Sequence, residues 1–366
     1  MAFFNREQDI NRMKSILSGE PNLVYFVYGP INSGKTALLI KVFEELPENY
    51  RFFYINFRAR DVEDIKDLLK VLFSVKKGPG KLSEFLKEIL KGGAKSVEKI
   101  SGIPIPERIF DLLFNRVDKV EDVFAFLENY FEEIVKKDIV PVFVLDEMQT
   151  IKEVLNTTGR PVIGRLFNFL IRLTKETHLC HCLCATSDCL FIEDVYSNAR
   201  LEGRAEYILV DDLDREHALV MYEKFGFKEK DFIFEYLGGK IGDIIRLFEK
   251  KKQGYIEREG IERMIKDETS KLEYFLEKVE FGEKYLLFED KKIFIGIEGI
   301  KETLKVFKEN EEISKKEISP IYRNYLISEN IIFYNPLEGI VRPQGRILWH
   351  ALRRLTGNLS HFTGHQ

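Results

Sequence analysis

Short apolar runs alternate with stretches of helical periodicity along the first two hundred residues. Five of these runs have the length and composition of buried strands, and they cover residues 23–28, 51–57, 141–145, 179–185 and 205–210. Most of the segments between them, including the long stretch that follows the second run, carry apolar residues at helical spacing. Strands that alternate with helices are typical of an α/β fold, which is the class that we expect here.

Beyond residue 212 the pattern becomes helical. Apolar positions in residues 215–225, 231–237 and 241–250 predict a compact helical lid. Farther along, short helices are expected at residues 300–307, 313–316 and 318–326, followed by a hairpin of residues 331–334 and 340–342. Three helices and a hairpin describe a winged helix. The expected domains are a core over residues 1–212, a lid over residues 213–260 and a winged-helix domain over residues 261–366.

A Gly-rich loop connects the first strand with the helix that follows it. The loop and the start of the helix read Gly29, Pro30, Ile31, Asn32, Ser33, Gly34, Lys35, Thr36 and Ala37. The two glycines allow the backbone N–H groups to turn inward and, with the helix N-terminus, to cradle β- and γ-phosphates. Lys35 adds a point charge, and the Thr36 hydroxyl can bind the Mg²⁺ that bridges the phosphates. The pattern predicts a nucleotide-binding P-loop.

Two adjacent acids end the third apolar run. Asp146 would hold the shell of the Mg²⁺ ion, and Glu147 would point toward the γ-phosphate to orient and polarise the attacking water. Alone, an apolar strand that ends in a solvated acid pair is common. Downstream of a P-loop, the same pattern indicates the Walker B element of an ATPase.

Polar residues at the tip of the fourth strand are further candidates. Thr186 or Ser187 could lie beside the γ-phosphate, although the same stretch could simply cap a helix that starts at Cys189. Within this strand His178, Cys180, Cys182 and Cys184 share one face, which is a pattern that could indicate a metal site. Side chains splayed along one strand cannot all surround one tetrahedral ion, so we expect buried core residues instead.

Composition and charge narrow the functional classes. The formal net charge of −4 gives no global reason to bind nucleic acid or an anionic membrane. No apolar run is long enough for a membrane span, and the N-terminus lacks the apolar core of a signal peptide. The four cysteines are confined to residues 180–189 instead of forming a disulfide framework. We expect a cytoplasmic protein that has no membrane partner.

Together these features resemble the archaeal ATPase family, in the signal-transducing branch of AAA-like P-loop proteins, over nearly the whole chain. The resemblance rests on Phe4, Asn5, Arg6 and Glu7, on residues 29–36 and 145–149, on Gly203 and Arg204, and on residues 341–346. It implies a five-stranded parallel sheet, ATP as the ligand, and use as a regulated ATPase or switch.

The resemblance also suggests roles for single residues. Asn5 and Arg6 stand where such ATPases place residues that cover the adenine, and Arg204 becomes a candidate for sensing the γ-phosphate of its own or a neighbouring subunit. The alternative without a functional role is that Arg200 or Arg204 forms an ion pair with a surface carboxylate. The chain departs from the family in the lid, where Ile241 replaces the proline of the usual Gly-Gly-x-Pro turn.

The first functional hypothesis is an ATP-hydrolysing switch that uses Mg²⁺, acts in a possible homo-oligomer and moves its winged helix. The alternative is a winged-helix DNA-binding regulator with a mainly structural nucleotide site. A small-molecule kinase is a third hypothesis, and it is disfavoured because the sequence shows no separate motif that would bind a phosphate acceptor. A basic group in the wing and the last helix could contact DNA phosphates, and it comprises Arg342, Arg346, His350, Arg353 and Arg354. Nearby acids at residues 309, 311, 312 and 317 favour a protein partner instead.

Overall fold

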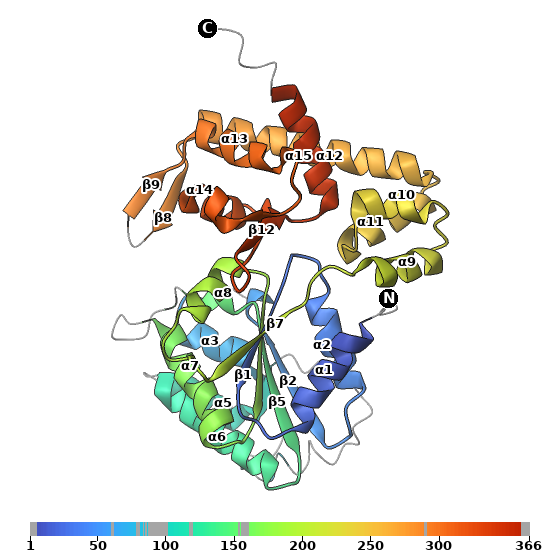
Figure 1. Cartoon of the computed structure of the whole chain (residues 1–366). Helices are drawn as coiled ribbons and strands as arrows, with labels where there is room; N and C mark the ends of the chain where they lie inside the picture. The colour runs from blue at the N-terminus through green and yellow to red at the C-terminus, as the bar shows by residue number, and fades with distance from the viewer. Residues whose placement is uncertain are drawn as a thin grey trace.

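The computed structural model describes residues 6–59, 62–77, 81, 82, 84, 86, 102–116, 120–152, 154, 161–288 and 291–359. Its centre is a parallel sheet with the strand order β2–β5–β6–β1–β7 (Figure 1). The strands are β1 (Val24–Tyr28), β2 (Tyr50–Asn56), β5 (Val140–Asp146), β6 (His181–Thr186) and β7 (Ala205–Leu209). The prediction of a five-stranded parallel sheet in an α/β fold is confirmed.

All five strands point the same way, so their carboxyl ends meet at one edge of the sheet. Tyr28 at the end of β1 lies opposite Thr186 of β6 and Leu209 of β7, and Asp146 of β5 lies opposite Ala185. The segments that follow β1, β5 and β6 are therefore gathered together. This edge is where open parallel sheets bind their ligands.

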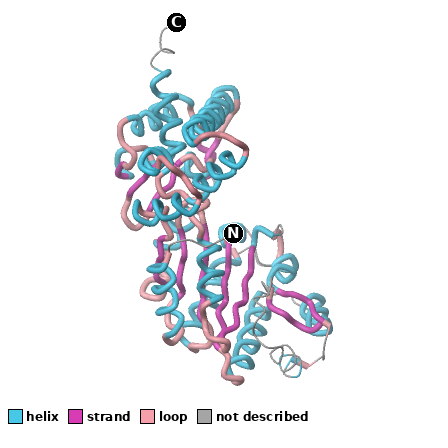
Figure 2. The backbone as a smooth tube through the Cα atoms, turned by 90° about the vertical axis from the view of Figure 1, so that its right-hand side faces the viewer, coloured by secondary structure: helices cyan, strands magenta, loops and turns pink. Residues whose placement is uncertain are grey.

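Helices cover both faces of the sheet (Figure 2). The helices α1 (Glu7–Ser18) and α2 (Lys35–Glu44) pack on one face, through a core that includes Val27 of β1. The other face carries α3 (Ile65–Leu72), α5 (Glu107–Arg116), α6 (Val120–Val135), α7 (Val162–Ile171) and α8 (Cys189–Tyr196). Side chains alternate between the two faces along a strand, so Phe26 points into the second core.

Cys180, Cys182 and Cys184 belong to this second core, as the sequence predicts. All three side chains are buried. Burial disfavours the charged thiolate and raises the pKa of Cys184 well above its usual value. These thiols are packing groups of a central strand.

The helical lid is also confirmed. It consists of α9 (Arg215–Lys224), α10 (Lys230–Leu237) and α11 (Ile241–Lys252). A long helix, α12 (Glu257–Phe281), then leads into a distinct C-terminal domain above the carboxyl edge of the sheet (Figure 1). This domain contains β8 (Tyr285–Phe288), β9 (Lys291–Phe294), α13 (Ile297–Lys305), β10 (Ile313–Ser314), α14 (Pro320–Ser328), β11 (Ile332–Asn335), β12 (Ile340–Pro343) and α15 (Arg346–Leu359).

Two details of the C-terminal half differ from the expectation. Residues 313–316 do not form the single helix expected: Ile313–Ser314 pair with β12 as a short strand, and a 3-10 helix of three residues, Lys315–Glu317, follows. The boundary expected at residue 260 falls inside α12. Gly260 is a helical residue there, and a Cβ on it would approach the Leu247 side chain of α11 to 2.7 Å. The expected hairpin is present as β11 and β12.

A second, two-stranded parallel sheet was not expected. It pairs β3 (Phe73–Lys76) with β4 (Ile103–Pro106), in a stretch whose pattern predicts helices and a break. The apolar spacing of residues 82–90 also predicts a helix, and most of that range lies outside the described residues. Among the helices that the structure describes, none is both long and apolar enough to cross a membrane.

Candidate functional site

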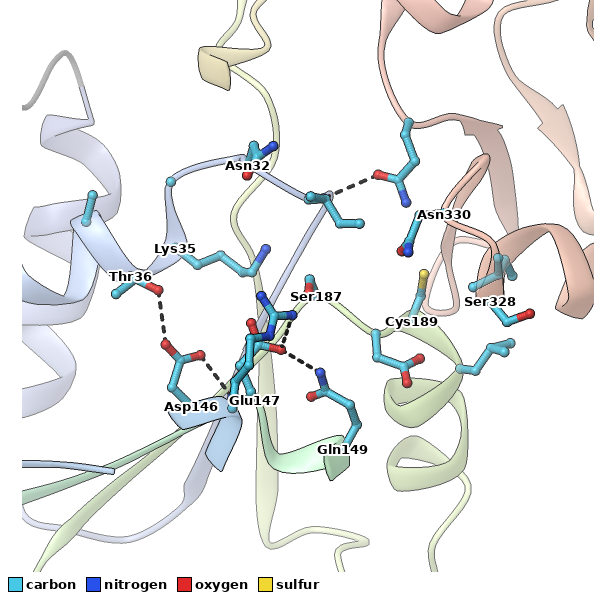
Figure 3. A pocket seen from close by; sticks show the side chains of 18 residues that line it. Asn32, Lys35, Thr36, Asp146, Glu147, Gln149, Ser187, Cys189, Ser328 and Asn330 are labelled. Atoms are coloured by element: carbon cyan, nitrogen blue, oxygen red, sulfur yellow. Dashed lines mark hydrogen bonds and ion pairs between the residues drawn. The ribbon is translucent and has the colours of Figure 1, made fainter. Parts of the chain in front are cut away.

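A cleft of about 800 Å³ opens at the carboxyl edge of the main sheet (Figure 3). Residues of the Gly-rich loop and α2 form one side, and the tips of β5 and β6 form the floor. The C-terminal domain contributes the remaining wall, through Ile327, Ser328, Asn330 and Gln344. The site is therefore built by segments more than three hundred residues apart in the sequence.

The Gly-rich loop has the predicted backbone conformation. Gly34 precedes α2 with a φ of 94°, in the left-handed region that favours glycine. At Gly29 a Cβ would lie 2.2 Å from the Val210 carbonyl oxygen, so a larger residue would force the loop away from the segment after β7. The glycines expected at the two ends of the loop are required by close approach and by a positive φ.

The loop folds back over Lys35. Its ammonium group donates hydrogen bonds to the carbonyl oxygens of Gly29 at 3.0 Å and Pro30 at 2.9 Å. Burial lowers the pKa of Lys35 to about 8, although the carboxylates of Glu147 and Asp146 oppose that shift. The site holds a cation whose charge is only weakly stabilised by its surroundings.

Thr36 and Asp146 meet at the floor of the cleft. The Thr36 hydroxyl donates to Asp146 Oδ2 at 3.0 Å. The Tyr54 hydroxyl of β2 donates to the same carboxylate oxygen. Sequence reasoning paired Thr36 with Asp146 but missed Tyr54, whose place beside them depends on the pairing of β2 with β5.

Glu147 is held in place by two side chains. Its carboxylate accepts a hydrogen bond from Gln149 Nε2 at 2.5 Å and lies 3.0 Å from the guanidinium of Arg58. The Glu147 backbone has a φ of 60°, which is unusual and costly for a residue with a Cβ. Neither Arg58 nor Gln149 was a predicted site residue.

Thr186 does not line the cleft, in contrast to its expected place beside a phosphate. It is buried, and its hydroxyl donates to Gln149 Oε1 at 2.8 Å. Ser187, the other candidate at this strand tip, is the residue that faces the cleft. Asp188 caps α8 by accepting a hydrogen bond from the Phe191 N–H at 3.0 Å, so the helix-cap alternative is correct for that residue.

The N-terminal segment reaches the back of the loop. The Arg6 guanidinium donates to the Ser33 carbonyl oxygen at 2.6 Å and to the Asp211 carbonyl oxygen at 2.5 Å. A smaller cleft of about 200 Å³ opens beside it, between the start of α1 and the segment after β7. Asn5, the other predicted residue of this segment, lies outside the described residues.

Arg204 lies at the wrong end of the sheet for a role in its own cleft. It precedes β7, and its carbonyl oxygen accepts a hydrogen bond from the N–H of Val24, the first residue of β1. The loop follows the other end of β1, roughly 16 Å away for a five-residue strand at ~3.3 Å per residue. The Arg204 guanidinium instead donates to the Arg200 carbonyl oxygen at 2.9 Å.

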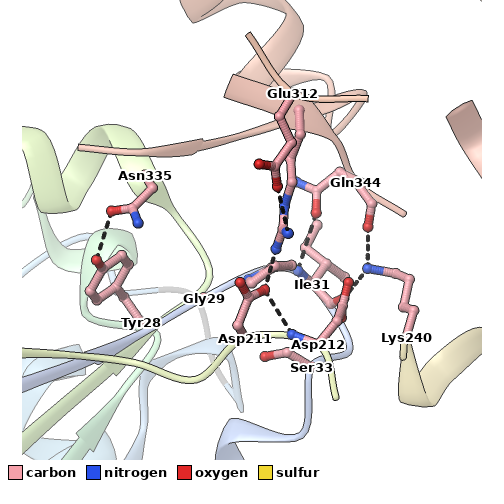
Figure 4. A network of polar contacts seen from close by, with 12 residues as sticks. Tyr28, Gly29, Ile31, Ser33, Asp211, Asp212, Lys240, Glu312, Asn335 and Gln344 are labelled. Carbon is pink, nitrogen blue, oxygen red and sulfur yellow. Dashed lines mark hydrogen bonds and ion pairs between the residues drawn. The ribbon is translucent and has the colours of Figure 1, made fainter. Parts of the chain in front are cut away.

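The lid and the C-terminal domain both hold the Gly-rich loop (Figure 4). Lys240 of the lid donates to the Ile31 carbonyl oxygen at 2.8 Å and also to the Gln344 carbonyl oxygen. Gln344 in turn accepts a hydrogen bond from the Ile31 N–H at 3.3 Å. The lid contacts the loop although its turn lacks the proline usual in the resembled family.

The C-terminal domain also contacts the core away from the loop. Tyr28 at the end of β1 donates a hydrogen bond to Asn335 Oδ1 at 2.9 Å. On α8, Glu193 pairs with Arg323 at 3.2 Å and accepts a hydrogen bond from the Tyr334 hydroxyl at 3.1 Å. These contacts fix the C-terminal domain against two elements that border the cleft.

The basic group that could contact DNA is largely engaged within the chain. Arg342 pairs with Asp211 and with Glu312, and Arg346 lies 2.8 Å from Glu311. Farther along α15, Arg354 lies 2.6 Å from Glu262 of α12, and Arg353 stacks on the Trp349 ring. Glu311 and Glu312 therefore neutralise Arg346 and Arg342, two of the arginines that could otherwise contact DNA phosphates.

Comparison with known proteins identifies the family of the chain. Residues 3–247 match a family described as an ATPase domain predominantly from Archaea, and residues 258–356 match the C-terminal domain of uncharacterized ATP-binding proteins like MJ1010. Two uncharacterized ATP-binding proteins of Methanocaldococcus jannaschii, MJ0147 and MJ0801, are 41% and 40% identical to this chain over 97% of its length. The matches cover 98% and 100% of those proteins.

A solved structure shows the same fold. The Walker-type ATPase PABY2304 of Pyrococcus abyssi superposes with a TM-score of 0.61, covering 96% of each chain at 16% sequence identity. At that identity the likeness concerns the fold alone. From the family match and the M. jannaschii relatives, the chain belongs to the family of ATPase domains found predominantly in Archaea.

Proposed function

We propose that this protein binds ATP with Mg²⁺ in the larger cleft and hydrolyses it, as a switch that couples the nucleotide to the C-terminal domain. The observation that carries the proposal is the convergence of Lys35, Thr36, Asp146 and Glu147 from two different strand ends. The family and the relatives named ATP-binding proteins support it. A triphosphate also fits a cleft of about 800 Å³.

The oxygen groups at the floor suit Mg²⁺. Thr36 and Asp146 offer a hydroxyl and a carboxylate 3.0 Å apart, which are hard oxygen donors of the kind that Mg²⁺ takes together with phosphate oxygens. When bound there, the ion would neutralise charge on the β- and γ-phosphates. Tyr54 keeps the Asp146 carboxylate turned toward Thr36.

Side chains and backbone groups of the chain would bind the phosphates and activate the water. The loop N–H groups and Lys35 bind the phosphates, so the ammonium group exchanges the carbonyl oxygens of Gly29 and Pro30 for phosphate oxygens. Glu147 orients a water molecule and accepts its proton as the water oxygen attacks the γ-phosphorus. The bond from that phosphorus to the bridging oxygen breaks, leaving ADP and phosphate. Gln149, itself held by Thr186, fixes the direction of the Glu147 carboxylate.

The smaller cleft beside Arg6 is our proposed place for the adenine. Arg6 joins the first helix to the back of the loop and to the segment after β7. A base lying there would be covered from the N-terminal side, as the family resemblance implies for Asn5 and Arg6. Arg6 would act by shaping this pocket, because its guanidinium is engaged with two carbonyl oxygens.

The contacts at Ile31 support the switch. Lys240 holds its carbonyl oxygen and Gln344 accepts from its N–H, so both the lid and the C-terminal domain are bonded to one residue of the loop. A phosphate that moves the loop must strain or break these bonds. We also propose a winged helix for the C-terminal domain, because α13, β10, α14, β11 and β12 follow the order of that fold. The domain boundary would then lie before α12 at Glu257.

The DNA-binding alternative has little support in the geometry. Its main arginines are paired with acids of the same chain. A protein partner of the C-terminal domain and a homo-oligomer remain predictions.

Two substitutions test the proposal. Lys35→Ala should abolish tight ATP binding, because it removes the positive charge that meets the phosphates. Glu147→Gln should keep binding and lower turnover by roughly a hundredfold, a typical contribution of a general base. Equilibrium nucleotide binding and phosphate release should be measured for both, beside the parent chain. Lys41→Ala is a matched control, since Lys41 is a lysine of α2 that pairs with surface glutamates. Parental turnover in Glu147→Gln would refute the assignment.

A further inference from the structure

Arg58 lines the cleft and follows β2, a strand that belongs to neither the Gly-rich loop motif nor the Asp146–Glu147 motif. It lies in the short turn Phe57–Ala59 that follows β2, and its N–H donates to Asn56 Oδ1 at 2.9 Å, which fixes the turn. The guanidinium lies 3.0 Å from Glu147 Oε2. Among the described residues that line the cleft, the cationic side chains are Lys35 and Arg58.

The two cations stand in different surroundings. Lys35 is 9% exposed and enclosed by the loop, whereas the Arg58 side chain is 67% exposed and approaches the cleft from its open side. Water reaches the guanidinium and screens the pair from that side, although the Glu147 side chain is only 14% exposed, so the pair contributes less than a fully buried one would. The Arg58–Glu147 pair is therefore easily exchanged for a more highly charged partner.

A γ-phosphate is such a partner. It carries more negative charge than one carboxylate, and its oxygens can accept paired hydrogen bonds from the planar guanidinium. Thr36 and Asp146 would hold a metal ion beside the phosphates, and Glu147 would orient the attacking water from its own side of the cleft. Arg58 stands on that same side. ADP lacks the γ-phosphate and would leave the Arg58–Glu147 pair intact.

We propose that Arg58 recognises the γ-phosphate and thereby distinguishes ATP from ADP. In the same exchange it leaves Glu147 Oε2, which still accepts the hydrogen bond from Gln149, so the carboxylate keeps its direction while the cation beside it moves to the phosphate. No proton or covalent bond changes in this step; one ion pair is replaced by another. The inference rests on the proposed function, and it gives the chain an arginine in its own cleft, which Arg204 at the opposite end of β7 cannot supply.

The test compares affinities for two nucleotides. Dissociation constants should be measured with Mg²⁺ for ADP and for the non-hydrolysable β,γ-imido analogue of ATP, with the full-length chain. Arg58→Ala should weaken the analogue by about tenfold, the usual order for a lost charged hydrogen bond, and change ADP less than twofold. Arg172→Ala is the matched control, because Arg172 is an exposed arginine whose Nε lies 2.8 Å from Glu128, and it follows α7 at the start of the π-helical segment Arg172–Glu176.

A second comparison tests the exchange itself. Glu147→Gln removes the resting partner of Arg58, so this variant should bind the analogue several-fold more tightly than the parent chain does. The gain should disappear in the Arg58→Ala, Glu147→Gln double variant, because no guanidinium is left to benefit. ADP affinity should stay level across the series.

Other outcomes separate the inference from the proposed function. Equal weakening of the analogue and ADP in Arg58→Ala would overturn the inference, and so would affinities for both that match those of the parent chain. Both results leave ATP binding by the parent chain in place. If the parent chain bound neither nucleotide, the proposed function itself would fail.

Discussion

ATP should bind about tenfold more weakly at pH 9 than at pH 7, because Lys35 loses its proton over this range. In the nucleotide-free chain, burial lowers the pKa of Lys35 to about 8. The protonated fraction then falls from about nine-tenths at pH 7 to about one-tenth at pH 9. Bound phosphates favour the charged ammonium and raise its pKa again. Affinity should be level below pH 8 and fall about tenfold per pH unit above it.

Calorimetry can measure this proton directly. Titrations of ATP with saturating Mg²⁺, in two buffers of different ionisation heat, give the number of protons taken up on binding. Uptake should be about 0.1 at pH 7, 0.5 at pH 8 and 0.9 at pH 9. Lys35→Arg is the control, since a guanidinium keeps its charge throughout this range. A level affinity from pH 7 to pH 9, or equal proton uptake by Lys35→Arg, would refute the reasoning.

Two further predictions concern packing and placement. Gly239→Ala should destabilise the chain by about 3 kcal/mol or more, because the new Cβ would lie 1.7 Å from the Leu213 carbonyl oxygen. Gly203→Ala, with a φ of 64° and no atom within 4 Å of its Cβ, should cost only about 1 kcal/mol; equal thermal unfolding of both variants would contradict the contact. Arg204→Ala should leave ATP turnover of the dilute chain unchanged, and a loss there would contradict its placement at the far end of β7. If Arg204→Ala loses turnover only at high concentration, where chains could associate, mixing it with Lys35→Ala should restore activity, because the arginine would then act across a subunit interface.

The sequence predicted the elements whose signals are continuous. Residues 29–37 contain the whole phosphate loop and the start of its helix, and residues 140–147 contain a buried strand with its terminal acids. Hydrophobic periodicity was sufficient for the five strands of the main sheet and for the lid helices. These features depend on local conformation and burial, which neighbouring residues largely dictate.

Features that join distant segments were missed or misplaced. The β3–β4 sheet pairs residues about thirty positions apart, and no local pattern records such a pairing. Thr186 and Ser187 were equivalent candidates in the sequence, and the fold turned the serine to the cleft and the threonine to Gln149. Arg204 precedes its strand, as predicted, while the loop follows β1; parallel strands put those two positions at opposite edges, so the role suggested for Arg204 stays a prediction only for a neighbouring subunit.

The sequence by itself determined that the chain has a Gly-rich loop between a strand and a helix, two adjacent acids at the end of a buried strand, and alternating strands and helices, since each of these is recorded in a short local stretch. Only the tertiary structure decided what surrounds them. It brought Arg58 to Glu147, Tyr54 to Asp146, and Gln344 to Ile31, a contact across 313 positions. Such contacts depend on strand order and domain docking, which are set by the burial of many apolar side chains together and not by any local stretch of the chain.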